Sequence, residues 1–281
     1  MRKSSRHARN SRYGRSNGFS TSQVLTIIGA AVLAIAVAAL FYYQNSKEKV
    51  VYDRATACPM VGDSIRPKAQ TVVVIDETDV LTPHQRDYLK VHLKNFVNNE
   101  IEPGELLSIY ILDDQIQKAR RPIFEMCKMR DGSDARKFTE NQRLMAKRFQ
   151  QKFQGPLMNR IDETLSRQKS ADSSPIFETL QTISVNSFDK YQTEGLRRLV
   201  MFSDMLHYTP QYSMFTTHHS FTSLKESDYY SQIKTFLPDT AVKLYFLSTY
   251  PQYQKQELVE FWKKYFKDTS AFVDEVIPVG R

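Results

Sequence analysis

The sequence lacks the motifs of several enzyme classes. It contains no G-x-x-x-x-G-K-[ST] segment, so nucleotide hydrolysis has no phosphate-binding loop, and no G-x-S-x-G segment to expose a serine nucleophile. No pair of His or Cys residues with zinc spacing supports the adjacent His218 and His219 as metal ligands. There is also no internal repeat or low-complexity tract. These absences favour a binding module over an enzyme.

Acidic residues are missing from the first part of the chain. None precedes Glu48, while residues 1–21 carry six basic residues: Arg2, Lys3, Arg6, Arg9, Arg12 and Arg15. The whole chain has a net charge of +8, so the remainder is close to neutral. Because nucleic-acid binding needs a basic surface on the folded domain, we expect no nucleic-acid partner.

Charged side chains are also missing from residues 24–43, "VLTIIGAAVLAIAVAALFYY". About 20 apolar residues in a helix span the hydrocarbon of a bilayer, and we predict a transmembrane helix over residues 22–43. A cleaved signal is the alternative, but its apolar core is shorter, about 7 to 15 residues. The basic tail predicts a cytoplasmic N-terminus. The chain is then a single-pass inner-membrane (cell-membrane) protein with a periplasmic or otherwise extracytoplasmic C-terminal part.

Only two cysteines are present, Cys58 and Cys127. On the oxidising side of a membrane they can form a disulfide, which would tie a linker at residues 44–69 to the folded domain. Two unpaired thiols are the alternative. The linker is expected to be irregular because Pro59, Gly62 and Pro67 are spaced through it.

Apolar segments alternate with helical patterns from residue 70 to the C-terminus. Strands are predicted at 71–75, 106–112, 196–204 and 241–248, and helices after Thr82, at 141–153, 157–165, 175–183 and 258–266. Residues 113–140 give no clear pattern. Such alternation predicts an α/β domain, residues 70–281, with a doubly wound, mostly parallel sheet covered by helices on both faces.

Acidic residues follow two of the predicted strands. "DETD" follows the first strand and Asp204 follows the third. The carboxyl ends of parallel strands form the usual binding edge of such a sheet. Like charges gathered there need a cation, solvent or a basic partner to offset their repulsion.

With its residues placed in this way, the chain resembles the von Willebrand factor A (vWA) family, which carries a metal-ion-dependent adhesion site. Asp76 and Thr78 match the first and third positions of its D-x-S-x-S loop, Ser174 stands where the family has a threonine at a helix start, and Asp204 matches the aspartate after a later strand. The resemblance implies that these four residues ligate a divalent cation such as Mg²⁺, which prefers oxygen donors.

The match is incomplete, because Val80 replaces the second serine of that loop and offers no ligand. Asp79 is expected to face the other way if the strand geometry continues. Without a metal, Asp76 and Thr78 would form a capped strand-to-helix turn. We expect Asp79, His207 and Tyr208 to contribute to the binding surface, with His207 and Tyr208 at its rim.

The sequence therefore predicts a membrane-anchored, vWA-like module that binds another protein and is not an enzyme. One alternative is a metal-assisted hydrolase of the cell envelope using the same acids, although Thr78 stands where a haloacid-dehalogenase phosphatase needs its second acid. Another is a structural subunit that contacts a second membrane protein through the small side chains of the anchor helix: Thr26, Ala30, Ala34 and Ala38.

Overall fold

The computed structural model describes residues 20–45, 50–136, 139–167, 170–191, 193–216 and 218–280. The chain divides into two compact units, Met1–Lys49 and Val50–Arg281. The predicted basic tail falls outside the described residues except for Ser20 and Thr21. We treat the two units separately.

The first unit contains helix α1 (Thr21–Asn45), in agreement with the predicted apolar helix. Its segment Thr21–Tyr43 has the length and apolar composition of a membrane span, a test that a signal sequence near the N-terminus also passes. Membrane anchoring and orientation therefore stay predictions.

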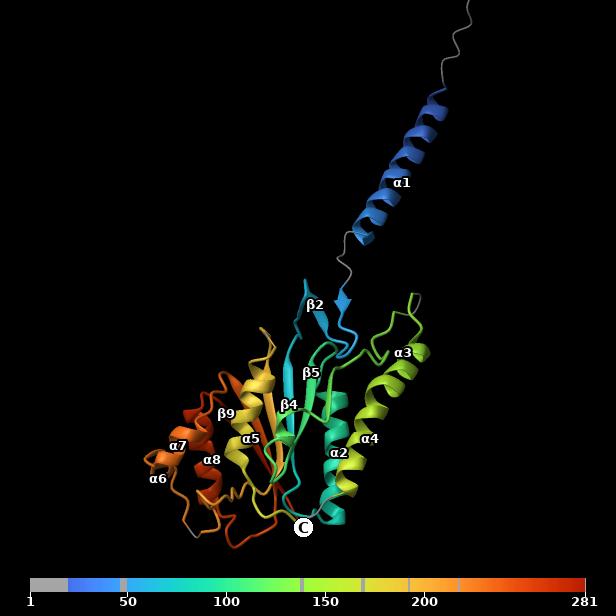
Figure 1. Ribbon diagram of the computed structural model, residues 1–281. Coiled ribbons are helices and arrows are strands. Elements are labelled where there is room, and N and C mark those ends of the chain that lie inside the picture. Colours follow the sequence, from blue (N-terminus) through green and yellow to red (C-terminus); the bar gives the residue numbers. More distant parts are fainter. Residues whose placement is uncertain are drawn as a thin grey trace, which may run out of the picture. The chain divides into compact units, whose positions relative to one another are not determined.

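The second unit is built on a six-stranded sheet with the order β6-β5-β4-β7-β8-β9 (Figure 1). Its strands are β4 (Gln70–Asp76), β5 (Leu106–Leu112), β6 (Phe124–Cys127), β7 (Arg197–Ser203), β8 (Thr240–Leu247) and β9 (Phe272–Val279). All neighbours pair in parallel except β5 and β6. The four predicted strands are confirmed, and the two edge strands were missed.

Helices cover both faces of this sheet, as predicted. On one face, α2 (Pro83–Asn99) and α4 (Gly155–Ser166) pack on Val73 and Ile75 of β4. On the other, α5 (Ile176–Ile183), α7 (Asp228–Ile233) and α8 (Gln256–Asp268) pack on Val72 and Val74. Successive side chains of a strand point to opposite faces, so one strand contributes to both cores. The architecture is consistent with a vWA-like fold.

The remaining helical segments are short. They are η1 (Lys118–Arg120), α3 (Gln142–Phe149), the π-helices η2 (Gln150–Gln154) and η3 (Ser184–Phe188), and α6 (Phe221–Lys225). The N-terminus of α2 is capped as the sequence predicts. Thr82 Oγ1 accepts a hydrogen bond from Gln85 N at 3.2 Å, and Gln85 Oε1 accepts one from Thr82 N at 3.0 Å.

Part of the predicted linker is ordered, which corrects the expectation of irregular structure. Strands β1 (Val51–Tyr52), β2 (Pro59–Val61) and β3 (Ser64–Ile65) form a small antiparallel sheet that belongs to the second unit. Gly62, with φ of +60°, starts the two-residue turn between β2 and β3. Gly62 is thus a turn residue and Pro59 begins the central strand of this sheet, while Pro67 lies between β3 and β4.

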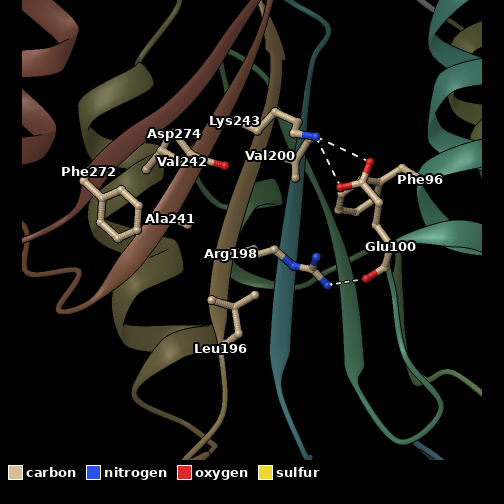
Figure 2. A pocket seen from close by; sticks show the side chains of 10 residues that line it. All are labelled: Phe96, Glu100, Leu196, Arg198, Val200, Ala241, Val242, Lys243, Phe272 and Asp274. Atoms are coloured by element: carbon tan, nitrogen blue, oxygen red, sulfur yellow. Dashed lines mark hydrogen bonds and ion pairs between the residues drawn. The ribbon is translucent and has the colours of Figure 1, made fainter.

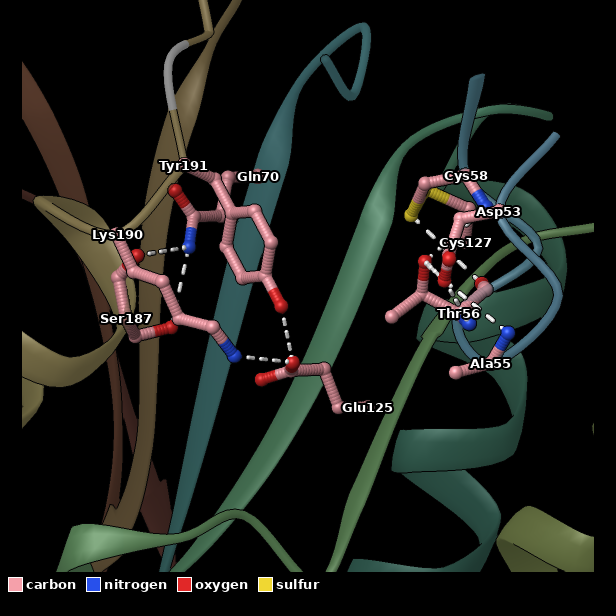
Figure 3. Close-up of polar contacts among 10 residues, drawn as sticks. All are labelled: Asp53, Ala55, Thr56, Cys58, Gln70, Glu125, Cys127, Ser187, Lys190 and Tyr191. Atoms are coloured by element: carbon pink, nitrogen blue, oxygen red, sulfur yellow. Dashed lines mark hydrogen bonds and ion pairs between the residues drawn. A yellow bond between two sulfur atoms is a disulfide. The ribbon is translucent and has the colours of Figure 1, made fainter. Parts of the chain in front are cut away.

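A disulfide between Cys58 and Cys127 joins the small sheet to β6 (Figure 3). Both cysteines are fully buried, and Cys127 N donates a hydrogen bond to Thr56 O at 2.7 Å. The predicted pairing is confirmed, and the alternative of two unpaired thiols is wrong.

Candidate functional site

The carboxyl ends of β4 and β7 lie side by side. In the parallel register Ile75 is opposite Phe202, so Asp76 ends its strand next to Ser203, and Asp204 follows directly. Asp76 and Asp204 are each only 5% exposed. The fold therefore brings together two carboxyl groups that are 128 positions apart in the sequence.

The Asp76 carboxylate is fixed by three hydrogen bonds. Its Oδ1 accepts from Thr78 N at 3.0 Å and from Thr78 Oγ1 at 2.6 Å, and its Oδ2 accepts from Ser203 Oγ at 2.6 Å. The first two bonds form the capped turn that was the alternative to a metal site. Ser203 was missed as a site residue, although it stands directly before Asp204 in the sequence.

The Asp204 carboxyl group is less well satisfied. Its Oδ1 accepts from Leu206 N at 2.9 Å, while Oδ2 is buried with no hydrogen-bond partner among the described residues. The following residue, Met205, has φ of +60°, and its carbonyl accepts from Trp262 Nε1 at 2.9 Å. The core thus holds this loop in a conformation that places a half-satisfied carboxyl group in the interior.

The acidic cluster of Asp76, Asp79 and Asp204 is electrostatically unfavourable. Burial, followed by the nearby Asp76 carboxylate, raises the pKa of Asp204 well above its ordinary value, and Asp79 adds to the effect. Burial also raises the pKa of Asp76. Among the described residues, no Lys, Arg or His forms an ion pair with any of the three. No basic side chain of this part of the chain therefore offsets the repulsion.

Asp79 lies with the other two acids, so the expectation that it faces away is wrong. Its carboxylate is close enough to Asp204 to raise the pKa of Asp204 by charge repulsion. Strand alternation does not apply to Asp79 because β4 ends at Asp76. Its Oδ1 accepts a hydrogen bond from Tyr250 Oη at 3.0 Å, a contact that nothing in the sequence indicates.

A neighbouring acid, Glu77, is also perturbed. Burial, with a smaller contribution from Asp113, raises its pKa to about 7. Its Oε1 is buried without a hydrogen-bond partner among the described residues. Glu77 was not predicted as a site residue.

The loop that contains Ser174 lies against the other two. Ala171 N donates to Thr78 O at 2.9 Å, and Ser174 forms a two-way backbone bridge with Tyr208 at 2.7 and 2.9 Å. Ser174 Oγ is buried and has no hydrogen-bond partner among the described residues. Backbone hydrogen bonds therefore connect the predicted loops at one edge of the sheet.

His207 is fully buried, which corrects its expected place at the rim. Its Nδ1 accepts from Ile176 N at 3.1 Å, and its Nε2 lies 3.1 Å from Tyr229 Oη and 3.3 Å from Thr209 Oγ1. Burial lowers its pKa to about 3, so the imidazole is neutral. A polar residue just after a strand can turn inward when it caps a helix, and this one holds the start of α5 next to the Asp204 loop.

An aromatic cluster lies next to the acids. The rings of Tyr208, Tyr250 and Tyr253 each contact Phe215, with centroid distances of 5.6, 5.2 and 5.4 Å. Tyr208 is 45% exposed, and Val80 is 57% exposed. Tyr208 therefore lies at the surface, as predicted, and Val80 presents an apolar side chain to solvent.

A pocket of about 290 Å³ lies elsewhere, near the amino ends of β7, β8 and β9 (Figure 2). Arg198 and Lys243 line it, but both are engaged by acids: Arg198 pairs with Glu105, and Lys243 with Glu100 and Glu275. Two neutralised cations give little attraction for an anionic ligand, so this pocket is not our candidate site.

Metal ligation at the acidic cluster would need hydroxyl groups. No group of three or more His, Cys, Asp or Glu side chains in the described part of the chain is arranged to hold a metal ion. A cation would therefore rely on the hydroxyls of Thr78 and Ser174 as well as the carboxylates. Such oxygen donors suit Mg²⁺, which also keeps several waters.

Comparison with known proteins gives limited similarity. No protein-family model and no curated protein matches the chain. Similar solved structures include the SpRpn10 VWA domain, with 8% identity, a TM-score of 0.39 and coverage of 75% of this chain and 88% of that one.

Two further structures are similar over part of their length. Proximal thread matrix protein 1 from the mussel byssus has 11% identity and a TM-score of 0.37, covering 75% of this chain and 41% of its own. The pilus adhesin SpaC from Lactobacillus rhamnosus GG has 7% identity and a TM-score of 0.38, covering 80% of this chain and 29% of its own.

Proposed function

We propose that this protein is a membrane-anchored, vWA-like interaction module. It binds a partner protein through the loops at the carboxyl end of its sheet, with a divalent cation such as Mg²⁺ held near Asp76, Thr78, Ser174 and Asp204. Helix α1 is the anchor, and the second unit lies on the extracytoplasmic side. The confirmed disulfide supports this placement because disulfides persist in oxidising compartments.

The observation that carries the proposal is the uncompensated charge at this edge. Two nearly buried carboxyl groups repel each other, and Asp204 Oδ2 and Ser174 Oγ have no hydrogen-bond partner among the described residues. Buried polar atoms are usually satisfied, so exceptions need a reason. A bound cation would ligate such oxygen atoms and offset the repulsion. The donor set therefore fits a hard divalent ion.

The residues around the cluster suit protein binding. Exposed Tyr208 and Val80 flank the acids, and aromatic side chains are enriched at the centres of interfaces. A partner would then place apolar side chains on this rim and an acidic group toward the cation. The partner's acidic group would complete the coordination of the ion.

The geometry favours binding over catalysis. His207, the buried histidine next to the Asp204 loop, has both ring nitrogens engaged and a pKa of about 3. A general base for hydrolysis at neutral pH needs a pKa closer to 7 and access to the substrate. His207 is therefore no base for hydrolysis, and Glu77, whose pKa of about 7 would suit a base, has its Oε1 buried. We therefore propose binding rather than catalysis at this site.

Partner capture tests the proposal. Native membranes that contain the full chain are treated with a chemical crosslinker, and the crosslinked proteins are compared between Mg²⁺ and EDTA. We expect a specific adduct that requires Mg²⁺ and is lost in Asp76→Ala. The matched control, Asp87→Ala, removes an exposed acid from α2 and should keep the adduct. An adduct that survives in both EDTA and Asp76→Ala would contradict the cation-dependent site.

A further inference from the structure

The exposed apolar side chains of the second unit are unevenly distributed. Val80, Val91 and Tyr208 lie on other parts, and Leu144 lies in the first turn of α3. Eight gather around the amino ends of the strands, and we call them the amino-end surface: Val50, Val51, Tyr52, Val61, Val185, Leu196, Phe236 and Phe272. Concentrated apolar exposure of this kind marks an interaction surface.

Three members stand at the starts of neighbouring strands. Leu196 directly precedes β7, Phe236 precedes β8, and Phe272 begins β9. Because β7, β8 and β9 pair in parallel, their starts lie at one edge of the sheet. The three side chains are 51%, 61% and 52% exposed. Figure 2 shows Leu196 and Phe272 on neighbouring parts of this edge.

The other members are connected to the same edge. Val185 lies in η3, where Ser184 Oγ donates to Phe236 O at 2.7 Å. Val51, Tyr52 and Val61 lie in the small sheet, which the disulfide joins to Cys127 opposite the start of β5. In Figure 1 this small sheet extends beyond the amino ends of β4 and β5. The members of the amino-end surface thus belong to elements at one end of the domain.

Chain length indicates what covers this surface. Helix α1 ends at Asn45, and the second unit begins at Val50. Five Cα–Cα steps of at most about 3.6 Å give a reach of about 18 Å. If α1 spans a membrane, as the proposed function states, Val50 lies within that distance of the end of the span. The chain therefore holds the part of the amino-end surface around Val50 close to the bilayer.

We infer that the amino-end surface rests on the bilayer, with its Phe, Tyr, Val and Leu side chains in the headgroup region. This inference rests on the proposed membrane anchoring. Aromatic and aliphatic side chains favour that interface. Charges of both signs are exposed nearby, Arg54 and Lys234 with Asp63 and Asp239, so apolar contact carries the docking rather than attraction to anionic lipid.

Docking in this way sets the orientation of the proposed binding site. Strand β4 has seven residues, and at about 3.3 Å each it is about 23 Å long. The loops with Asp76 and Asp204 then face away from the bilayer and toward a partner. A domain that rotated freely on its tether would expose all of its faces to a partner equally.

Lipid quenching of a fluorescent probe tests the inference. Four variants of the oxidised full chain each carry one added cysteine labelled with NBD. They are Phe236→Cys, Phe272→Cys, Val80→Cys and Ala34→Cys. It is reconstituted in vesicles of phosphatidylcholine and phosphatidylglycerol that contain a lipid with a spin label near the headgroup or deep in the acyl chain. Iodide in the buffer serves as an aqueous quencher. Circular dichroism verifies the fold of each variant.

We expect headgroup-labelled lipid to reduce emission from positions 236 and 272 strongly and from position 80 hardly at all. The deep label should quench position 34 in α1. If position 34 is quenched but 236 and 272 respond only to iodide, the anchor is present and the docking inference is overturned. If 236 and 272 resist both quenchers, another protein copy covers them, which also overturns it. If position 34 escapes the deep label, the anchoring itself fails.

Discussion

The two ends of the sheet differ in the partners of their buried acidic side chains. At the amino end, Glu105 is 2% exposed, and Arg198 Nη2 lies 2.6 Å from its Oε1, with Thr71 Oγ1 as a further partner. At the carboxyl end, Asp76 and Asp204 are equally buried, but no basic side chain of the described residues reaches them. The protein pairs Glu105 with an internal cation, whereas Asp76 is held only by hydroxyl and backbone hydrogen bonds and Asp204 Oδ2 has no partner among the described residues.

A partly buried acid, Glu125, is also paired with a cation. Glu125 on β6 accepts hydrogen bonds from Lys190 Nζ at 2.8 Å and from Tyr191 Oη (Figure 3). Glu105 and Glu125 thus each have a cation partner, although Glu125 Oε2 has no hydrogen-bond partner among the described residues. The lack of a basic partner for Asp76 and Asp204 among the described residues is what indicates a binding site, because acids at the loop edge of a parallel sheet are available to a ligand.

Replacing Arg198, the cation at the amino end, should give the largest loss of stability. Arg198→Leu leaves Glu105 buried and unpaired, and we expect a loss of about 3–5 kcal/mol in the free energy of unfolding. Urea denaturation measures it. The double variant Arg198→Leu/Glu105→Leu should recover most of the loss, since neither charge remains. A loss below about 1 kcal/mol would show that this pair is not needed to stabilise Glu105.

The disulfide is the second element that stabilises the amino end. It closes a loop of 69 residues, and its removal in Cys58→Ser/Cys127→Ser should cost about 4 kcal/mol in the free energy of unfolding. Reduced wild-type protein, as the matched control, should show a similar loss. Divalent cations should have the same effect on variant and wild type, because the acidic cluster lies at the other end of the sheet.

The acids at the carboxyl end should make the free energy of unfolding fall as pH rises. An acid paired with a cation has the opposite effect. Burial first, then Asp76, raises the pKa of Asp204, and burial raises that of Glu77 to about 7. An acid with a raised folded pKa binds its proton more tightly in the folded state, so stability falls as pH rises. We expect this loss between about pH 4 and about pH 7 in EDTA, at about 1.4 kcal/mol per unit of pKa shift.

Urea denaturation in steps of pH measures this loss. Asp204→Asn should reduce it, and Mg²⁺ should reduce it in the wild type because a bound cation replaces the proton. Stability that rises over the same range in EDTA would contradict the uncompensated cluster.

The smallest expected effect comes from the cap of helix α2. It tests whether the Mg²⁺ response depends on the helix start or on the acidic side chains. Thr82→Ala removes the cap of α2, which follows the Asp76 loop, and should cost about 1 kcal/mol by urea denaturation. The response of the variant to Mg²⁺ should remain that of the wild type. A loss of the Mg²⁺ response on uncapping would place the helix start, rather than the acids, at the centre of the site.

Much of the fold could be predicted from the sequence because local patterns determine it. The four apolar strands and the capped start of α2 each have a signature that tertiary contacts do not override. Strand β9 was missed since it is an edge strand, half exposed and interrupted by Asp274 and Glu275. Strand β6 and the small sheet have only two to four residues per strand, too few for a pattern.

The candidate site was predictable only in part. The positions of Asp76 and Asp204 follow from strand ends, which a sequence can locate. The inward turn of His207, the approach of Asp79 and the bonds from Ser203 and Tyr250 depend on loop conformations set by tertiary packing. Sequence periodicity says nothing about a residue once its strand has ended.

The most direct test of the central claim is a titration of the purified full chain with Mn²⁺, followed by electron paramagnetic resonance of the free ion, with Mg²⁺ as competitor. We predict one bound Mn²⁺ per chain, displaced by Mg²⁺ and lost in Asp204→Asn while Asp87→Asn retains it. Absence of bound ion in the wild type, or equal binding in Asp204→Asn, would contradict the proposal that the uncompensated acids form a cation site.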